Sequence, residues 1–439
     1  MVAAVSAPAT SPACDEGATP GSGVRSTPVC DGGATPDSGV RSTEGVQAAQ
    51  AFCAAPAPAL RVLRAGLMTS VQDQGRPSMA ALALSRGGAA DLDAAATANR
   101  LVGNGPADAV LEITGPGPRL EIPCDLWLAS FGARHALLAE AIAGRPLHNP
   151  IALPLHRPLF VPAASILRWD APSAGWRSWI AFAGGLQGEV VLGSRSAHLA
   201  AGIGEGMLGA ASRIALSHDV EHLSRRRALG VLGDRAFSRA HQFGEAAWPR
   251  WQLADPLPLG WPRMDIPVLA GRHWNLLDEA SRGQLLAQEW TVSPQSNRQG
   301  LRLDVVAGSG KAIAASGLAN LASEAVGLGT VQLPPAGCPV ILMAEHQTTG
   351  GYPRVLEVAS AGCGLLAQAC GRCRIRFQRI SLAQADQMSE DLALRRQRLA
   401  LGLRDRYLRC TVLESASPSC AAPAHHPGHS PGHHPGHSL

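Results

Sequence analysis

The strongest constraint on the fold is a repeated pattern of short apolar segments separated by turn residues between residues 59 and 385. Runs of this kind, rich in Val, Ile, Leu and aromatic residues and bounded by Gly, Pro, Asn, Asp and Ser, are typical of β-strands. Many short strands in two groups favour two antiparallel barrels over a doubly wound sheet. The predicted strands are 61–65, 125–130, 165–169, 177–183, 265–270, 300–306, 354–360 and 374–380.

Two further pairs of apolar segments are predicted to form hairpins. VLEIT (110–114) and RLEIP (119–123) flank the sequence GPGP, and VQLP (331–334) and PVILMA (339–344) flank PAGC. Short Gly- and Pro-containing connections between two apolar runs favour antiparallel pairing of those runs.

Helices are predicted at only three places, and they help to divide the chain. Helix signals occur at 92–102, where Asp91 can cap the first turn, at 278–288 and at 382–408. The expected organisation is a low-complexity tail, a first β-barrel lobe, a linker, a second β-barrel lobe, a C-terminal helix and a tail rich in His, Pro and Gly. Their respective bounds are 1–58, 59–225, 226–263, 264–385, 386–412 and 413–439.

Both end segments have compositions that favour disorder. CDEGATPGSGVRSTP, from Cys14, recurs with few changes from Cys30, and the C-terminal segment contains HHPGHSPGHHPGHS. Neither segment carries enough large apolar side chains to offset the entropy of ordering. The C-terminal histidines could hold a transition metal, but a solvated tail is the favoured interpretation, and no metal site is predicted.

The overall composition limits the classes of partner. The 439 residues are 46% hydrophobic, enough for more than one core, and carry a net charge of only +4 without basic runs. Aromatic residues make up 4%, which argues against a nucleic-acid-binding surface. Ten scattered cysteines, no basic leader and no apolar stretch of about 18 residues predict a cytoplasmic chain that has no membrane partner.

Several short motifs are incomplete. GSGK (308–311) lacks the first glycine and the hydroxyl residue of a phosphate loop, and GEGMLG (204–209) does not open a helix after a strand. A single C-x-x-C, Cys370 and Cys373, favours buried thiols over a zinc or redox site. His218 and His222 have helical spacing but no third ligand. Neither H-E-x-x-H nor G-x-S-x-G occurs.

Three polar clusters remain as candidate sites. EHQTTGGYP (345–353) follows a buried strand, and its glycines would allow a ligand to approach the backbone; a tight turn with a structural His346 is the alternative. VSPQSNRQGLRL (292–303) contains Arg298, which could hold a carboxylate or phosphate. SRGGAADLDAAATANRLVGN (85–104) leads into a helix whose N-terminus could receive an anion, or whose Asp91 is merely the cap.

These three clusters together resemble one family: the C subunit of 5-oxoprolinase, also called allophanate hydrolase subunit 2 or the biotin-dependent carboxyltransferase family. The resemblance also rests on GLMTSVQDQGRP (66–77), the run from LVGN to LEIT (101–114), AGG…VLGSRSAHL (183–199) and VQLPPAG, in the same order, and it covers about residues 60–385. It implies a mainly β protein with two cyclophilin-like β-barrel lobes, in agreement with the predicted strands.

The resemblance also implies an enzymatic role. Such a chain is expected to act as the C subunit of an ATP-dependent 5-oxoprolinase, an amidohydrolase that opens the lactam of 5-oxo-L-proline to L-glutamate together with the A and B subunits. ATP is the expected cofactor of the complex; whether this chain contacts it is left open. The alternatives are the carboxyltransferase component of a urea carboxylase and a non-catalytic regulator that binds an inhibitor of a histidine kinase. Lys311 lacks the flanking methionines of a biotin site, so no biotin is expected on this chain.

Site residues follow from the same resemblance and from the clusters. Proton transfer is expected from Glu345 or His346, orientation of the amide from Gln347 and Thr349, and anion binding from Arg298 and the Gly350 and Gly351 amides. The expected catalytic residues are Glu345, His346 and Gln347; the expected substrate-binding residues are Gln295, Ser296, Arg298, Thr348, Thr349, Gly350, Gly351 and Tyr352; and the expected first-lobe or interface residues are Asp73, Arg76, Ser85 and Asp91. Tyr352 is equally well explained as a structural aromatic residue that closes its loop. Cys338 and the GLQGE turn (185–189) depart from the family pattern and leave the substrate open.

Overall fold

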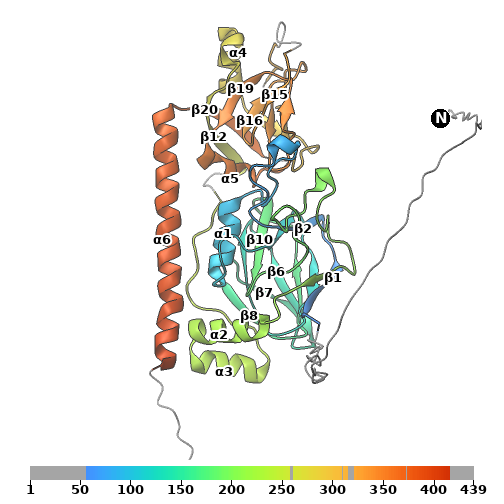
Figure 1. Cartoon of the computed structure of the whole chain (residues 1–439), viewed down its shortest axis with the longest axis vertical. Coiled ribbons are helices and arrows are strands. Elements are labelled where there is room, and N and C mark those ends of the chain that lie inside the picture. Colours follow the sequence, from blue (N-terminus) through green and yellow to red (C-terminus); the bar gives the residue numbers. More distant parts are fainter. Residues whose placement is uncertain (1–55, 258–260, 309, 315–320, 372, 416–439) are drawn as a thin grey trace, which may run out of the picture. The chain divides into compact units, whose positions relative to one another are not determined.

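The computed structural model describes residues 56–257, 261–308, 310–314, 321–371 and 373–415, and within them it confirms the mainly β class (Figure 1). The expectations for the N-terminal tail up to residue 55 and for the C-terminal tail from residue 416 lie outside the described residues. Two groups of strands separate along the chain, as the apolar pattern predicts.

The first lobe consists of two sheets. Its six-stranded sheet has the order β11-β1-β4-β9-β6-β7, and its five-stranded sheet has the order β2-β3-β10-β5-β8. The strands are β1 (Ala59–Arg64), β2 (Met68–Gln72), β3 (Val110–Thr114), β4 (Arg119–Glu121), β5 (Leu126–Gly132), β6 (Leu137–Ile142), β7 (Arg145–Leu153), β8 (Pro158–Val161), β9 (Ile166–Trp169), β10 (Arg177–Phe182) and β11 (Arg213–Ala215).

Alternation along β3 explains why the five-stranded sheet is buried on both faces. Leu111 and Ile113 belong to the core between the two sheets, whereas Val110 belongs to a second core beneath helix α1 (Leu92–Leu101). Successive strand residues point to opposite faces, so an apolar residue at each position requires a cover on each side. Glu112 therefore points toward the helix side and is 2% exposed.

One expectation for the first lobe is wrong. VLEIT and RLEIP do not form a hairpin: β3 pairs with β2 and β10, and β4 pairs with β1 and β9. The GPGP segment instead carries the chain from one sheet to the other. The two sheets of this lobe face each other across one shared core.

The second lobe contains a closed barrel with the order β12-β19-β16-β17-β14-β13-β20. The VQLP–PVILMA hairpin is confirmed by the antiparallel pairing of β16 with β17. A separate two-stranded sheet joins β15 to β18. The strands are β12 (Arg263–Ala270), β13 (Trp290–Val292), β14 (Gly300–Val305), β15 (Glu324–Ala325), β16 (Thr330–Gln332), β17 (Val340–Leu342), β18 (Thr349–Gly350), β19 (Arg354–Val358) and β20 (Arg374–Arg379).

The segment expected as a linker contains helices. Besides α1, the helices are α2 (Val220–Leu232), α3 (Asp234–Phe243), α4 (Glu279–Ala287), α5 (Cys363–Leu366) and α6 (Leu382–Ser415). Val220 and Ala228 of α2 are fully buried against the first lobe, which explains why 220–243 folds onto that lobe. Of the helices in the described ranges, none combines the length and the apolar character that a membrane crossing would need.

Candidate functional site

The two loops expected to form the site lie side by side at one end of the barrel. Strand β14 follows the 292–299 loop, β17 precedes the 345–353 loop, and the two strands pair antiparallel. Two backbone hydrogen bonds continue this pairing: Glu345 N donates to Arg298 O (2.8 Å) and Met343 N donates to Gln299 O (2.9 Å). The loops are therefore held against each other by the register of the barrel.

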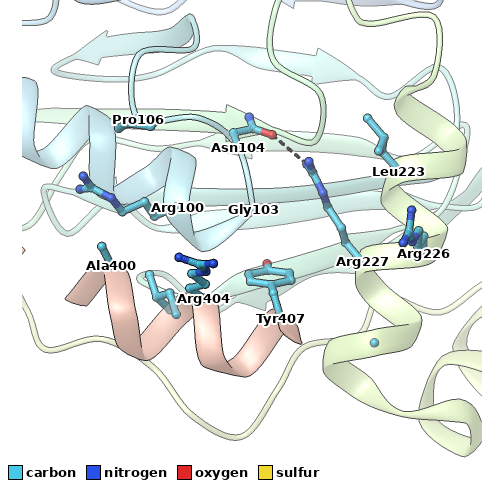
Figure 2. Close-up of a pocket in the computed structure, with 12 residues that line it drawn as sticks. Arg100, Gly103, Asn104, Pro106, Leu223, Arg226, Arg227, Ala400, Arg404 and Tyr407 are labelled. Carbon is cyan, nitrogen blue, oxygen red and sulfur yellow. Dashed lines mark hydrogen bonds between the residues drawn. The ribbon is translucent and has the colours of Figure 1, made fainter. Parts of the chain in front are cut away.

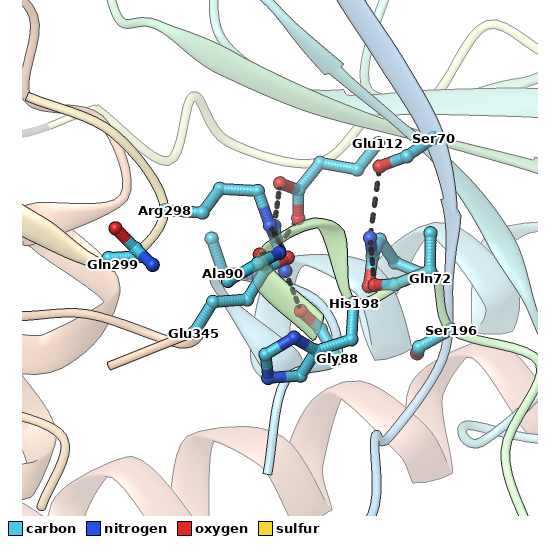
Figure 3. Close-up of polar contacts among 12 residues, drawn as sticks. Ser70, Gln72, Gly88, Ala90, Glu112, Ser196, His198, Arg298, Gln299 and Glu345 are labelled. Carbon is cyan, nitrogen blue, oxygen red and sulfur yellow. Dashed lines mark hydrogen bonds and ion pairs between the residues drawn. The ribbon is translucent and has the colours of Figure 1, made fainter. Parts of the chain in front are cut away.

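Four buried charged residues join this end of the barrel to the first lobe; Glu112, Arg177, Arg298 and Glu345 are called the interlobe polar cluster below. Figure 3 shows the Arg298 guanidinium between two carboxylates. Its Nε donates to Glu345 Oε1 (2.6 Å), its Nη1 donates to Glu112, and its Nη2 donates to Gly88 O (2.5 Å). Glu345 Oε2 accepts from Ala200 N (3.1 Å) and so also contacts the first lobe.

Glu112 stays ionised although it is buried. Its Oε2 accepts from Ala90 N (2.8 Å) and Trp179 Nε1 (2.9 Å), and Arg177 Nε lies 3.7 Å from Oε1. Burial acts to raise the pKa of Glu112, but Arg298 and Arg177, together with these hydrogen bonds, lower it below its usual range. Two carboxylates and two guanidinium groups give a cluster with no net charge.

The geometry corrects the expected role of Arg298 as a clamp for a substrate anion. Its side chain is 3% exposed, and all three of its nitrogens are already hydrogen bonded to protein acceptors. Burial alone would lower the pKa of Arg298, but Glu112 and Glu345 raise it. A guanidinium in this setting fixes the position of the two loops relative to the first lobe, and a ligand anion would have to displace one of its carboxylates.

A serine–histidine pair lies in the first lobe near Glu345. Burial lowers the pKa of His198, although Glu345 acts in the opposite direction. Ser85 Oγ and His198 Nε2 are 2.9 Å apart, and both side chains are buried. His198 Nδ1 accepts a hydrogen bond from Ala201 N (3.2 Å), so the ring proton is on Nε2 and points to Ser85. This tautomer cannot take the Ser85 proton, and the pair is therefore not an activated nucleophile.

The loop after Glu345 presents the polar groups that are open to solvent. His346 Nδ1 donates to Gln347 O (2.6 Å), which leaves Nε2 as a proton acceptor, and burial lowers the pKa of His346. Gln347 is exposed and its Nε2 donates to Gln332 Oε1 (3.2 Å). Thr349 and Gly350 form β18, and Tyr352 is 49% exposed. A neutral imidazole beside an amide side chain can move a proton and orient an amide substrate.

The other expected residues have structural roles in this arrangement. Asp73 accepts from Ser194 Oγ (2.5 Å) and Ser196 Oγ (2.6 Å), while Arg76 donates to the Val191, Ser194 and Ser196 carbonyls. Asp73 and Arg76 thus hold the 191–196 loop of the first lobe. Asp91 caps α1 by accepting from the Asp93 and Ala94 amides. These residues support the first-lobe side of the junction and do not join the exposed loop.

Part of the second expected cluster faces a different space. A cavity of about 700 Å³ lies between the lobes, with Ser293, Ser296 and Trp176 in its wall. Ser296 Oγ accepts from Arg302 N (3.0 Å), and Gln295 is exposed. No residue from His346 to Tyr352 lines this cavity. The structure therefore brings Arg298 and Glu345 together but separates Ser296 from the exposed loop.

The sequence did not predict three residues at the junction between the lobes: Glu112, Arg177 and Gln368. The Gln368 side chain accepts from the Trp176 and Arg177 amides and donates to Arg177 O. A charged residue inside the apolar strand VLEIT is the only sequence signal for Glu112. No group of three or more potential metal ligands occurs in the described ranges. Cys370 Sγ and Cys373 Sγ lie 3.4 Å apart, within hydrogen-bonding distance of each other.

Comparison with known proteins identifies relatives that match most of the described part of the chain. The model of the carboxyltransferase domain, subdomains A and B, matches residues 82–379. The protein named as the C subunit of 5-oxoprolinase in Escherichia coli (strain K12) is 31% identical over 332 residues, which cover 76% of this chain and 94% of that protein. The protein of the same name from Haemophilus influenzae is 27% identical over 325 residues, covering 72% and 89%.

Solved structures with a similar fold are also found. A crystal structure of TTHA0988 is 29% identical with a TM-score of 0.56, and the match covers 73% of this chain and 55% of that one. The urea carboxylase of Kluyveromyces lactis has a TM-score of 0.64 at 23% identity; the match covers 78% of this chain but only 29% of the carboxylase. The likeness to the carboxylase establishes a shared fold.

Proposed function

Because this chain belongs to the family of the carboxyltransferase domain, subdomains A and B, we propose that it is the C subunit of an ATP-dependent 5-oxoprolinase. The observation that carries the proposal is the match to a protein named as the C subunit of 5-oxoprolinase over 94% of that protein's length. A match of that extent includes both lobes and the junction between them.

The proposed reaction is the opening of the 5-oxo-L-proline lactam to L-glutamate. The lactam C–N bond breaks, the oxygen of water joins the carbonyl carbon, and the ring nitrogen gains a proton. Amide hydrolysis of this kind has a poor leaving group, and ATP hydrolysis by the complex of the A, B and C subunits supplies the driving force. In this proposal ATP is a reactant of the complex, and no residue of this chain is assigned to it.

We place the contribution of this chain at the loop from His346 to Gly351. The Nε2 atom of a neutral His346 moves the proton, Gln347 and Thr349 orient the lactam amide, and the Gly350 and Gly351 amides hold an anionic group. The exposure of Gln347 and the hydrogen bond from His346 Nδ1 to Gln347 O support this assignment. Gln295, Thr348 and Tyr352 remain proposed substrate contacts of the two loops, whereas Ser296 lines the separate cavity between the lobes and is not assigned a contact.

The interlobe polar cluster acts in this proposal as the support of that loop. Glu345 immediately precedes His346, and its carboxylate is fixed by Arg298 and by Ala200 N. A catalytic loop attached to a buried, hydrogen-bonded residue keeps its side chains in one arrangement, which lowers the entropy lost when the substrate binds. Arg298 and Glu345 are therefore positioning residues.

The test is 5-oxoproline-dependent ATP hydrolysis by the complex reconstituted from the A and B subunits and this chain. We expect His346→Ala and Gln347→Ala to lower turnover by about 100-fold or more, the usual contribution of a positioned acid–base group. His222→Ala and Gln387→Ala are matched controls, because both side chains are exposed on helices outside the two loops. Unchanged turnover in both loop variants would remove the assignment of His346 and Gln347 while leaving the subunit role intact.

Carboxyl transfer to a small amide is the second candidate, favoured by the name of the family model. A urea carboxylase component requires a carboxybiotin donor, so it is distinguished by the substrate. Biotin-dependent carboxylation of urea by the reconstituted partners, together with absence of 5-oxoproline turnover, would replace the first proposal with the second.

A further inference from the structure

A second cavity, away from the interlobe polar cluster, is lined by arginines from three helices. Its volume is about 470 Å³, and Arg100 of α1, Arg226 and Arg227 of α2 and Arg404 of α6 contribute to its wall. Figure 2 shows Arg227 and Arg404 beside the Tyr407 ring, with Arg100 of α1 and Arg226 of α2 on either side of them. No described aspartate or glutamate lines this space.

Most of this positive charge is not neutralised by the protein. Arg227 Nη1 donates to the neutral Asn104 Oδ1 (2.8 Å), and Asp108 is the only carboxylate of the described chain with a marked electrostatic effect on Arg227. Arg100, Arg226 and Arg404 form no ion pair or hydrogen bond with any described residue. Like charges around a shared space repel each other, and a bound anion would relieve that repulsion.

The cavity is held in place by buried contacts of α6. Tyr407 Oη donates to Leu101 O (2.5 Å) and accepts from Trp127 Nε1 (2.9 Å), and Leu403 is 4% exposed. Gly103 has a φ of +75°, and a Cβ atom there would lie 3.3 Å from Arg227 Nε, so a larger residue would crowd the arginine. The contacts of Tyr407 and Leu403 fix α6 against α1, which together form two of the cavity walls.

We propose that this cavity binds a small organic phosphate that carries two or three phosphate groups. Guanidinium groups bind phosphate oxygens in pairs of parallel hydrogen bonds, and four of them match the charge of a di- or triphosphate. A volume of about 470 Å³ accommodates a ligand of nucleotide size, and Leu223, Leu403 and the Tyr407 ring provide an apolar wall for its organic part. Helix α6 lies beyond the matched residues 82–379, so the site does not rest on the proposed function.

The experiment is isothermal titration calorimetry of the full chain with tripolyphosphate, a nucleoside triphosphate, orthophosphate and citrate as separate probes. We expect one site per chain for tripolyphosphate and for the nucleoside triphosphate, with weaker binding of orthophosphate. The variant Arg226→Ala/Arg404→Ala should weaken tripolyphosphate binding by about 100-fold, since each lost charge-assisted contact is worth roughly tenfold. Both side chains are exposed, so the fold should survive the change.

Arg395→Ala/Arg398→Ala is the matched control, because it removes the same charge from exposed positions of α6 that do not line the cavity. Binding of tripolyphosphate should be unchanged in this control. The proposal is overturned if the control loses affinity as much as the cavity variant, if citrate alone binds, or if no tripolyphosphate binding occurs at low salt. If the circular dichroism spectrum of Arg226→Ala/Arg404→Ala differs from that of the natural chain, the titration is repeated with the single variant Arg404→Ala. That variant should also bind tripolyphosphate more weakly than the natural chain.

Discussion

At the residue scale, the pKa values of the buried Glu112 and the half-buried Asp91 are shifted in opposite directions. Glu112 is flanked by Arg177 and Arg298, and its pKa is lowered despite burial. No cation of the described residues lies within ion-pair distance of Asp91. Burial raises the pKa of Asp91 to about 6, and the nearby carboxylates of Asp93 and Glu112 also raise it. The hydrogen bonds that Asp91 accepts from backbone amides lower the pKa but do not outweigh these effects. The carboxylate of Glu112 is therefore ionised, whereas that of Asp91 is partly protonated near pH 6.

Asp91→Asn should change how stability depends on pH. The pKa of Asp91 in the folded state lies above the value of 3.8 expected for the unfolded chain, so its contribution is most favourable below pH 3.8 and is lost as the pH rises through about 6. The free energy of unfolding of Asp91→Asn relative to the natural chain should increase by about 2 kcal/mol between pH 4 and pH 7. Urea denaturation at several pH values measures this difference.

The exposed Asp386→Asn is the control for that measurement, because its side chain lies on the solvent side of α6. Its free energy of unfolding relative to the natural chain should remain constant over the same pH range. If Asp91→Asn and Asp386→Asn gave parallel profiles, the pKa of Asp91 would not differ between the folded and unfolded states.

At the element scale, α6 is attached to the first lobe by a few specific contacts. The helix spans Leu382–Ser415 and most of its described side chains are exposed, so its own apolar face is narrow. Leu403 and the two hydrogen bonds of Tyr407 Oη connect it to α1 and β5. Arg406 also lies over the Trp251 ring, 4.6 Å from its centroid. The position of one wall of the arginine-lined cavity depends on these contacts.

Tyr407→Phe should loosen α6. The substitution removes the acceptor of Trp127 Nε1, which is then buried without a partner, and the donor to Leu101 O. We expect a loss of about 1–3 kcal/mol in stability, with faster amide hydrogen exchange concentrated in α6 and at the end of α1. The chain has two tyrosines, and Tyr352→Phe is the matched control because Tyr352 is 49% exposed. Equal exchange rates in both variants would contradict this role of Tyr407.

At the scale of the whole molecule, polar contacts hold the two lobes together. Arg298, Glu345 and Gln368 of the second lobe contact Glu112, Ala200 and Arg177 of the first. Arg177 Nη1 also donates to Ala367 O (2.8 Å). Buried polar contacts require defined geometry, because an unpaired partner is costly. They therefore specify one arrangement of the lobes in the described chain.

Arg298→Met should be among the most destabilising single changes. It leaves Glu112 and Glu345 buried without their shared cation, and such losses cost about 3–5 kcal/mol. Arg376→Met is the matched control: Arg376 pairs with Asp265 through two hydrogen bonds, but its side chain is 53% exposed, so the loss should stay below about 1 kcal/mol. Urea denaturation measures both, and Arg298→Met/Glu345→Gln should recover part of the lost stability. Equal losses in the two single variants would show that burial of the cluster is unimportant.

Local signals predicted most of the elements. The strands at 177–183 and 300–306 and the helix at 92–102 agree with β10, β14 and α1, because their apolar spacing and caps are properties of a few consecutive residues. The GPGP hairpin was wrong, since which strands pair depends on the packing of two whole sheets. Helices α2 and α3 were not predicted, because they lie in a segment rich in Arg, Pro and Trp. Their apolar residues form a recognisable face only where the helices pack against the first lobe.

The features of the candidate site also fall into those that the sequence predicts and those that only the tertiary structure shows. The sequence alone assigned the chain to the mainly β class and to its family. It also identified the loops that contain Arg298 and His346. Each of these features depends on residues that are consecutive in the sequence. Only the tertiary structure decided what Arg298 binds: Glu112 is 186 positions away in the sequence. It likewise assembled the four arginines of the second cavity from three helices. A charged side chain acquires its role from the groups that surround it after burial, and sequence order does not specify those groups.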